Sequence, residues 1–220
     1  MKLVEISTSE NEFITEAPQE YGKYFDHAQF AIDLMADGFI KSTSYEGAFF
    51  LMFFAAAQKH IILGALSGLR LHHVQANFNF RYASEAGAWA LYALAHPNQE
   101  NFAFLEEDGA LEPTKELKSQ MYKWLDEKYP AGSASLKRYK DSTNKLSSHA
   151  NIVDAHRNFG EMTRERISIS FFDKPEEHHV KTDLWAAANL VMGLLSLFDR
   201  ANKDYPQLVI RDDFLADIKN

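Results

Sequence analysis

The middle third of this chain is almost free of charged side chains, and this feature constrains the fold most strongly. Residues 42–105 contain only six Lys, Arg, Asp and Glu residues, although these types make up 25% of the whole sequence. The most apolar run, GAFFLMFFAAA at residues 47–57, lies inside this stretch. Side chains of this kind are stabilised by burial, so we expect the middle third to form the core and the flanking thirds to supply solvated surface.

The spacing of apolar residues predicts helices along most of the chain, because these residues recur with the period of 3.6 that places them on one helix face. Pro18 suits the first turn of the first helix, and His96-Pro97 ends the third. Short connections favour antiparallel neighbours in a bundle. The expected helices span about residues 18–37, 44–66, 69–95, 113–128, 133–153 and 180–203, the fifth beginning at Ser133 or Ser135.

The period changes to two in one segment, R-I-S-I-S-F at 166–171, which predicts a strand. We expect it to be half of a small hairpin that turns near Lys174-Pro175. The sequence therefore predicts a mainly α fold, an antiparallel bundle of five or six helices with a β-hairpin insertion near 166–180. The predicted domains are an N-terminal arm at 1–17 (a short strand or loose segment), one helical bundle at 18–203 and a C-terminal tail at 204–220.

Two opposite charges interrupt the apolar stripe of the third predicted helix. Arg81 and Glu85 are four residues apart, so their side chains meet on one face. A buried ion pair is costly to desolvate, and such pairs often line a polar pocket. We therefore expect a polar cluster of Arg81, Glu85 and His149 within the bundle. The alternative is a structural ion pair that fixes helix register or bridges a dimer seam.

The chain has nine histidines and no cysteine, which excludes disulfides, thiolate metal sites and cysteine nucleophiles. A di-iron bundle needs two E-x-x-H copies and two further glutamates. Only one copy occurs, from Glu176 to His179, and we expect it in a loop. We predict no metal and no cofactor, and the less favoured alternative is a metal-dependent enzyme that uses the histidines.

The sequence contains no G-x-S-x-G, no P-loop and no dinucleotide-binding G-x-G-x-x-G. The segment DAHRNFGEMTRER brings His156 and Arg157 close to a helix-to-strand junction. These two residues are the candidate anion-binding pair, and the alternative is a solvated loop.

A net charge of −8 does not favour nucleic-acid binding, although a local basic patch would permit it. The apolar run at 47–57 is shorter than the roughly 20 residues of a membrane-spanning helix, so we expect no membrane partner. The phenylalanine-rich predicted helix at 44–66 is apolar nearly all round. This indicates either a central position or contact with a second copy, and we predict a homodimer. We expect the protein to be soluble and cytoplasmic. Its expected function is binding or regulation, without established catalysis.

The sequence also carries a resemblance to known proteins. An R-x-x-x-E on a helix, R-Y-A-S-E from Arg81 to Glu85, precedes a helix that ends L-S-S-H at His149, then a short β segment and a long apolar last helix. Over roughly residues 45–200 this resembles uncharacterised bacterial helical proteins distantly similar to HEPN (higher-eukaryote and prokaryote nucleotide-binding) domains.

The resemblance implies an all-helical fold and, as the alternative function, a ribonuclease or toxin component acting on RNA. HEPN ribonucleases carry an R-x(4–6)-H motif, with the arginine and histidine near the scissile phosphate. This chain departs from that spacing, because Arg138 lies eleven residues before His149 and Arg157 follows His156.

Overall fold

The computed structural model describes residues 2–105, 111–112, 115–147, 156–162 and 167–211. Within these ranges the predicted mainly α fold is confirmed. The seven described α-helices are α1 (Leu3–Tyr21), α2 (Lys23–Asp33), α3 (Ala48–Leu69), α4 (His73–Ala95), α5 (Lys115–Lys128), α6 (Pro130–Ser147) and α8 (Glu177–Asp204). A π-helical turn spans Leu34–Gly38, and 3-10 turns span Tyr45–Gly47 and Gln99–Asn101. The strands are β1 (Ile40–Thr43), β2 (Phe104–Leu105), β3 (Leu111–Glu112), β4 (Phe159–Met162), β5 (Ile167–Ile169) and β6 (Leu208–Ile210).

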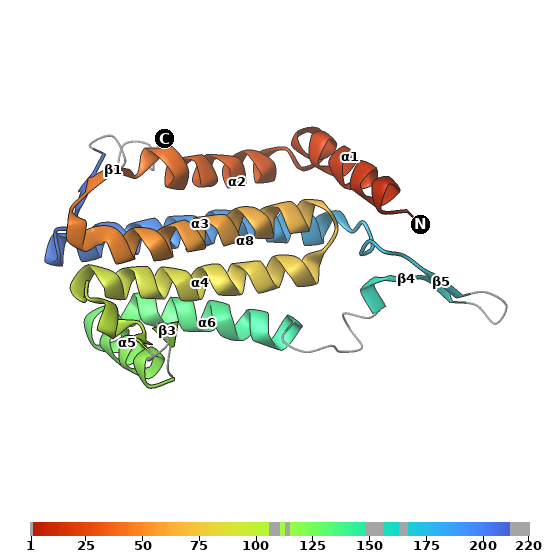
Figure 1. Ribbon diagram of the computed structural model, residues 1–220. Coiled ribbons are helices and arrows are strands. Elements are labelled where there is room, and N and C mark those ends of the chain that lie inside the picture. The colour runs from red at the N-terminus through yellow and green to blue at the C-terminus, as the bar shows by residue number, and fades with distance from the viewer. Residues whose placement is uncertain (1, 106–110, 113–114, 148–155, 163–166, 212–220) are drawn as a thin grey trace.

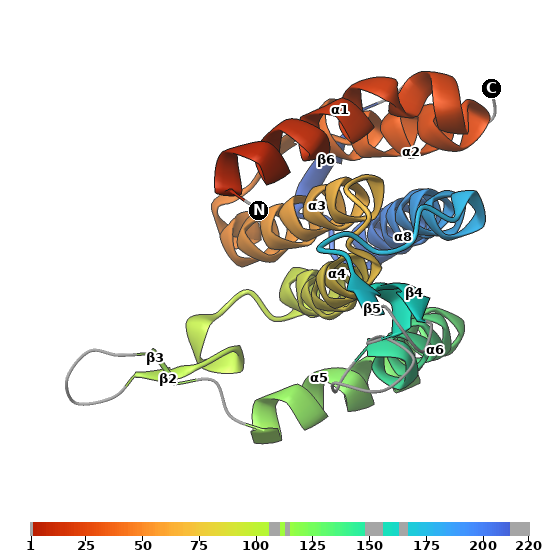
Figure 2. The same ribbon diagram turned by 90° about the vertical axis from the view of Figure 1, so that its right-hand side faces the viewer.

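The helices pack in layers (Figures 1 and 2), with the axes of α3, α4, α6 and α8 roughly aligned and α5 running across them. Helices α3 and α8 lie side by side in the middle, with α2 on one side of them and α4 on the other. Helix α6 packs against α4, and α5 packs against both. The strands form three two-stranded antiparallel pairs at the ends of the bundle, β1 with β6, β2 with β3 and β4 with β5.

Helix α3 is the centre of the core, which explains why it is apolar nearly all round. It contacts α1, α2, α4 and α8. Phe50 and Phe54 are buried, whereas Phe49 and Phe53 pack on Phe102 with ring centroids 5.0 Å and 5.3 Å away. Most of the apolar surplus noted in the sequence is therefore covered within one copy of the chain.

By length and composition, one helical segment of the described chain, Tyr45–Leu69, could cross a membrane. The central helix of a bundle satisfies the same criteria. Here 33% of the apolar window is buried, and the segment includes the fully buried Phe50, Ala57 and Ile61.

The N-terminal arm expected at 1–17 is instead most of helix α1, and the helix expected from Pro18 begins anew at Lys23. Pro18 lies inside α1, where its carbonyl accepts a hydrogen bond from Gly22 N–H. Gly22 then adopts φ +49°, a left-handed conformation that glycine tolerates, and separates α1 from α2. Ala17 and Tyr21 are buried in a small second cluster that includes Leu184 of α8. The burial of these two side chains stabilises α1 against the rest of the bundle.

The predicted hairpin exists, but its partner strand precedes β5 rather than following it. Strand β4 pairs with β5, Phe159 opposite Ile169. The chain does not turn back at Lys174-Pro175, because Asp173 N–H donates to Leu71 O and Lys174 N–H donates to Arg157 O. The first bond fixes the segment against the α3–α4 turn, and the second fixes it against the turn before β4. The predicted tail also contains structure, since β6 pairs with β1.

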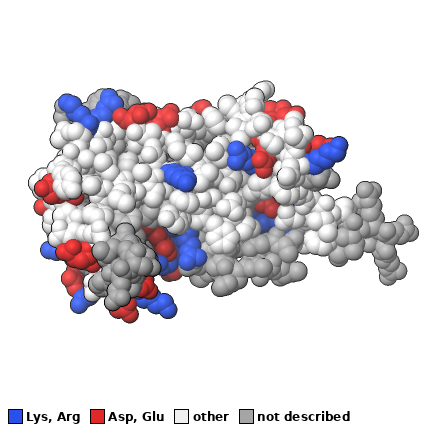
Figure 3. All heavy atoms as spheres, viewed as in Figure 1, with Lys and Arg blue, Asp and Glu red and all other residues white. Residues whose placement is uncertain are grey.

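Charged residues are sparse over the middle of the face shown in Figure 3, where α3 and α4 run. Some apolar side chains of these two helices remain exposed, notably Met52 (66%), Phe78 (41%) and Tyr82 (53%). The charge-poor middle third thus supplies the core and also part of the surface.

Candidate functional site

A buried histidine–aspartate pair lies at one end of the bundle, where α3 turns into α4. His73 is the first residue of α4, and its Nδ1 is 2.5 Å from Asp183 Oδ2 on α8. Its backbone N–H donates to Asp173 Oδ2 at 2.8 Å. His73 is 2% exposed and Asp183 7%. Asp183 therefore holds the imidazole of His73 and Asp173 holds its backbone, and both aspartates lie at least 100 residues further along the chain.

Two backbone positions near the His73–Asp183 contact, Leu71 and Gly68, allow it to form. Leu71, in the turn between the two helices, has φ +61°, which is rare for a residue other than glycine and occurs where surrounding contacts hold it. Its carbonyl accepts the Asp173 N–H described above. A Cβ on Gly68 would lie 2.8 Å from Asp183 Cβ and Oδ2, so only glycine lets α8 approach α3 this closely.

Burial affects the ionisation of Asp183. Burial raises the pKa of Asp183 above its usual value, and the hydrogen bond and charge of His73 oppose this rise only in part. The other ring nitrogen of His73, Nε2, is buried and has no hydrogen-bond partner among the described residues. Since buried polar atoms are nearly always satisfied, this nitrogen is a candidate for contact with a ligand.

His73 lines a cavity of about 240 Å³. The cavity lies between the α3–α4 turn, the segment before α8 and the short turn that precedes β4. Burial lowers the pKa of His179, whose ring centroid is 5.2 Å from that of His73, and the nearby charge of Arg157 lowers it further. The lining residues are His73, His156, Arg157, Asp173, Lys174, Glu176 and His179.

The sequence-predicted anion-binding pair, His156 and Arg157, lies in the lining of this cavity. His156 is exposed and Arg157 half-buried. The structure thus brings both residues together with His73, which the sequence analysis did not single out. The sequence did contain a pattern that could have identified Asp183. This charged residue lies three residues after Val180 and four before Ala187, on the otherwise apolar inward face of the last helix.

The predicted Arg81–Glu85 pair forms, but elsewhere and without deep burial. Arg81 Nε is 3.7 Å from Glu85 Oε1, and the two side chains are 34% and 22% exposed. The face of α4 that packs on its neighbours is rich in small residues, whereas Phe78 of the predicted inward stripe is exposed. The inward stripe predicted from the sequence is thus only partly buried: Leu71, Ala88 and Tyr92 are buried, whereas Phe78 is exposed. His149, the third member of the predicted cluster, lies outside the described residues.

Glu85 instead joins three helices through lysines. Lys118 Nζ of α5 is 2.9 Å from Glu85 Oε2, and Lys140 Nζ of α6 is 3.3 Å from Oε1. Burial alone would raise the pKa of Glu85, but the hydrogen bond and charge of Lys118, together with Lys140, lower it below its usual value. The contacts indicate a structural role, the alternative considered from the sequence.

Replacing Glu85 with glutamine tests this role. We expect the free energy of unfolding to fall by about 1 kcal/mol, because three cations lose their shared carboxylate and the site is partly solvated. Urea denaturation at low and high salt measures the loss, which we expect to shrink as salt rises. Glu116→Gln, an exposed position of α5, is the control. A loss equal to that of the control would show that the ion pairs contribute nothing.

Tyr122 of α5, in the same region, makes the free energy of unfolding depend on pH. Burial, followed by the charge of Glu85, raises its pKa to about 12. An unfolded tyrosine ionises near pH 10, so the unfolded state releases its proton first and stability declines as pH rises from about 10 to 12. Tyr122→Phe should reduce this alkaline decline by at most about 2 kcal/mol. Urea denaturation at pH 8 to 11.5 measures it, and parallel curves for parent and variant would contradict the assignment.

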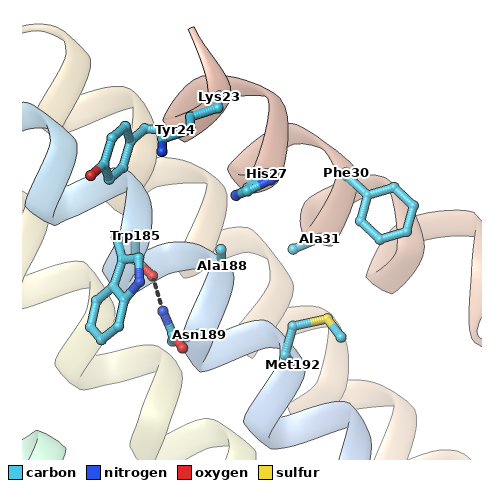
Figure 4. A pocket seen from close by; sticks show the side chains of 9 residues that line it. All are labelled: Lys23, Tyr24, His27, Phe30, Ala31, Trp185, Ala188, Asn189 and Met192. Atoms are coloured by element: carbon cyan, nitrogen blue, oxygen red, sulfur yellow. Dashed lines mark hydrogen bonds between the residues drawn. The ribbon is translucent and has the colours of Figure 1, made fainter. Parts of the chain in front are cut away.

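A second, larger cavity of about 460 Å³ lies between α2 and α8 (Figure 4). Trp185 and Met192 of α8 and Phe30 of α2 give it apolar walls, and Lys23 and His27 lie along one side. Trp185 is 60% exposed and Phe30 48%. The described residues show no buried polar group without a partner here, so we place the candidate site at the His73 cavity.

A scan against known protein families found no match, and searches of curated proteins and of solved structures found none either.

Proposed function

We propose that the protein is a ligand-binding protein and that the His73 cavity takes a small phosphate-bearing anion. The observation that carries the proposal is the buried, unpartnered Nε2 of His73 in a cavity also lined by Arg157, Lys174 and His156. Cationic groups on a cavity wall attract a phosphate. Because Nδ1–H is directed at Asp183, Nε2 donates to the phosphate in the doubly protonated form of the ring, whose positive charge a bound anion stabilises. Asp183 orients the ring by accepting at Nδ1, as carboxylates do for functional histidines.

The carboxylates of the cavity do not oppose this assignment. Asp173 accepts the backbone N–H of His73, and Glu176 lies within 3.6 Å of His178 Nε2 and 3.4 Å of His179 Nε2. The charge of Asp173 is therefore directed at the backbone of His73, whereas Glu176 is 48% exposed, so solvent screens its charge. The net charge of −8 favours a small ligand, because it repels a long polyanion more strongly than a single phosphate group.

Calorimetric titration with inorganic phosphate and with adenosine 5′-monophosphate tests the proposal. We expect saturable binding to the parent protein and a dissociation constant at least ten-fold higher for His73→Gln and for Lys174→Gln. His27→Gln, at an exposed position of α2, is the matched control and should bind like the parent. Circular dichroism checks that each variant is folded. Equal affinity of all four proteins, or no binding by the parent, would refute the proposal.

RNA cleavage is the second candidate function, and the grouping of His73, His156 and Arg157 at one cavity favours it. Transesterification needs one group to accept the proton of the ribose 2′-hydroxyl while its oxygen attacks phosphorus. Another group gives a proton to the departing 5′-oxygen as the P–O5′ bond breaks. Two imidazoles can fill these roles, and a guanidinium can stabilise the charge on phosphorus.

Incubation with a mixed RNA pool and with matched DNA separates the two functions. Cleavage of RNA alone, with 2′,3′-cyclic phosphate ends and loss of activity in His73→Gln and His156→Ala, would support the nuclease. Unchanged RNA, or identical digestion by parent and variants, would leave phosphate binding as the function.

We further propose that two copies associate through the exposed apolar residues of α3 and α4, Met52, Phe78 and Tyr82, and that the protein works in the cytoplasm. The first proposal rests on the sparse charge over these helices, which lowers the cost of burying them. The second rests on the absence of cysteine. Ultracentrifugation at micromolar concentration should show a dimer that Met52→Lys dissociates. A monomeric parent protein would refute the association.

A further inference from the structure

Three metal-ligating side chains converge where helix α8 begins. Glu176 immediately precedes the helix, and His178 and His179 lie in its first turn. One ligand atom from each lies within 4.8 Å of the other two. The single E-x-x-H of the sequence, from Glu176 to His179, is thus not in an open loop, and His178 adds a third donor.

The two separations that involve Glu176 fit ligands of one tetrahedral ion better than direct hydrogen bonds. Glu176 Oε2 is 3.6 Å from His178 Nε2 and 3.4 Å from His179 Nε2. Both distances exceed the usual 2.7–3.2 Å of an N–H···O bond. Two donors about 2.0–2.1 Å from one tetrahedral ion lie roughly 3.4 Å apart, because the angle between them is near 109°. One carboxylate oxygen therefore stands at ligand-to-ligand distance from two imidazole nitrogens.

We propose that Glu176, His178 and His179 bind a divalent first-row transition metal ion such as Zn²⁺. Imidazole nitrogen with a carboxylate oxygen suits these ions, and three protein ligands with one open position are typical of a reactive rather than a purely structural zinc site. Glu176 and His179 also line the His73 cavity, so the ion lies at its rim. The proposal does not rest on phosphate binding or RNA cleavage.

The neighbouring groups are compatible with an ion at this place. The three side chains are 48%, 70% and 34% exposed in the order Glu176, His178 and His179, so the ion can enter from solvent without opening the core. Glu177, the residue between the proposed ligands, pairs with Lys181. It therefore offers a control of the same type, one residue away in sequence and outside the ligand set.

Titration of the chelator-treated full chain with Zn²⁺ alone tests the proposal, and visible absorption of the Co²⁺ form gives a second readout. We expect one ion per chain and the intense visible bands of four-coordinate Co²⁺. Affinity should fall at least ten-fold in His178→Gln, His179→Gln and Glu176→Gln. Glu177→Gln and His27→Gln should bind like the parent. The ligand side chains are substantially exposed, so the variants should keep the parent melting temperature in chelator.

Two outcomes would overturn the proposal. One is the absence of saturable Zn²⁺ binding by the parent. The other is an equal, small loss of affinity in His27→Gln and in the three ligand variants, which would indicate scattered surface histidines rather than one site. Because phosphate is absent from this experiment, failure here leaves the phosphate titration of the His73 cavity unaffected, and failure of that titration leaves this result standing.

Discussion

Replacing Asp183 with alanine is expected to lower the free energy of unfolding by about 3–5 kcal/mol. The substitution removes the oxygen 2.5 Å from His73 Nδ1 and leaves a buried imidazole with neither ring nitrogen paired among the described residues. Removing one member of a buried pair costs more than the pair itself contributes, because the desolvation of the remaining group is no longer offset. For a domain of this size the melting temperature should fall by roughly 10 °C.

Two further variants isolate the cause of that loss. Asp183→Asn keeps an oxygen that can accept from Nδ1, so it should lose about half as much stability or less. Asp199→Ala removes an aspartate from the same helix, one that pairs with Lys203 at an i,i+4 spacing, and should change stability by less than about 0.5 kcal/mol. Thermal and urea denaturation of the three variants gives the comparison. A loss for Asp183→Ala no larger than for Asp199→Ala would show that the pair is solvated.

The core could be predicted from the sequence because its signal is local. Residues 42–105 are poor in charge and carry helical periodicity, and they became α3 and α4. Helix α1 was missed because the short alternation K-L-V-E-I-S outweighed a longer pattern. Ile6, Phe13, Ala17 and Tyr21 recur at helical spacing over the same region, and the last two are buried.

The site was less predictable because its parts are far apart in sequence. His73 and Asp183 are separated by 110 residues, and no periodicity links two such positions. Their contact follows from the packing of α8 against α3 and α4, which in turn needs glycine at position 68. The Arg81–Glu85 pair could be predicted because both residues share one helix. The exposure of the pair could not, since apolar residues lie on several faces of α4: Phe80 and Leu91 are buried, whereas Phe78 is exposed.

Truncating Phe198 to alanine is expected to cost about 3–5 kcal/mol through the cavity that it leaves. Phe198 of α8 is fully buried, and its ring centroid is 5.2 Å from that of Phe50, 5.8 Å from Phe54 and 6.3 Å from Phe39. Phe50 and Phe54 belong to α3, and Phe39 lies in the segment before β1. The Phe198 side chain therefore packs α8 against both of these segments.

The nature of this loss can be tested by keeping most of the volume. Phe198→Leu still fills much of the site and should cost less than half as much, whereas Trp185→Ala removes a larger side chain that is 60% exposed on the same helix and should cost under about 1 kcal/mol. Urea denaturation at neutral pH ranks the three. If Trp185→Ala proved as costly as Phe198→Ala, the outer face of α8 would have to be covered, by a second copy or by a ligand in the cavity between α2 and α8, and the core would not be complete within one chain.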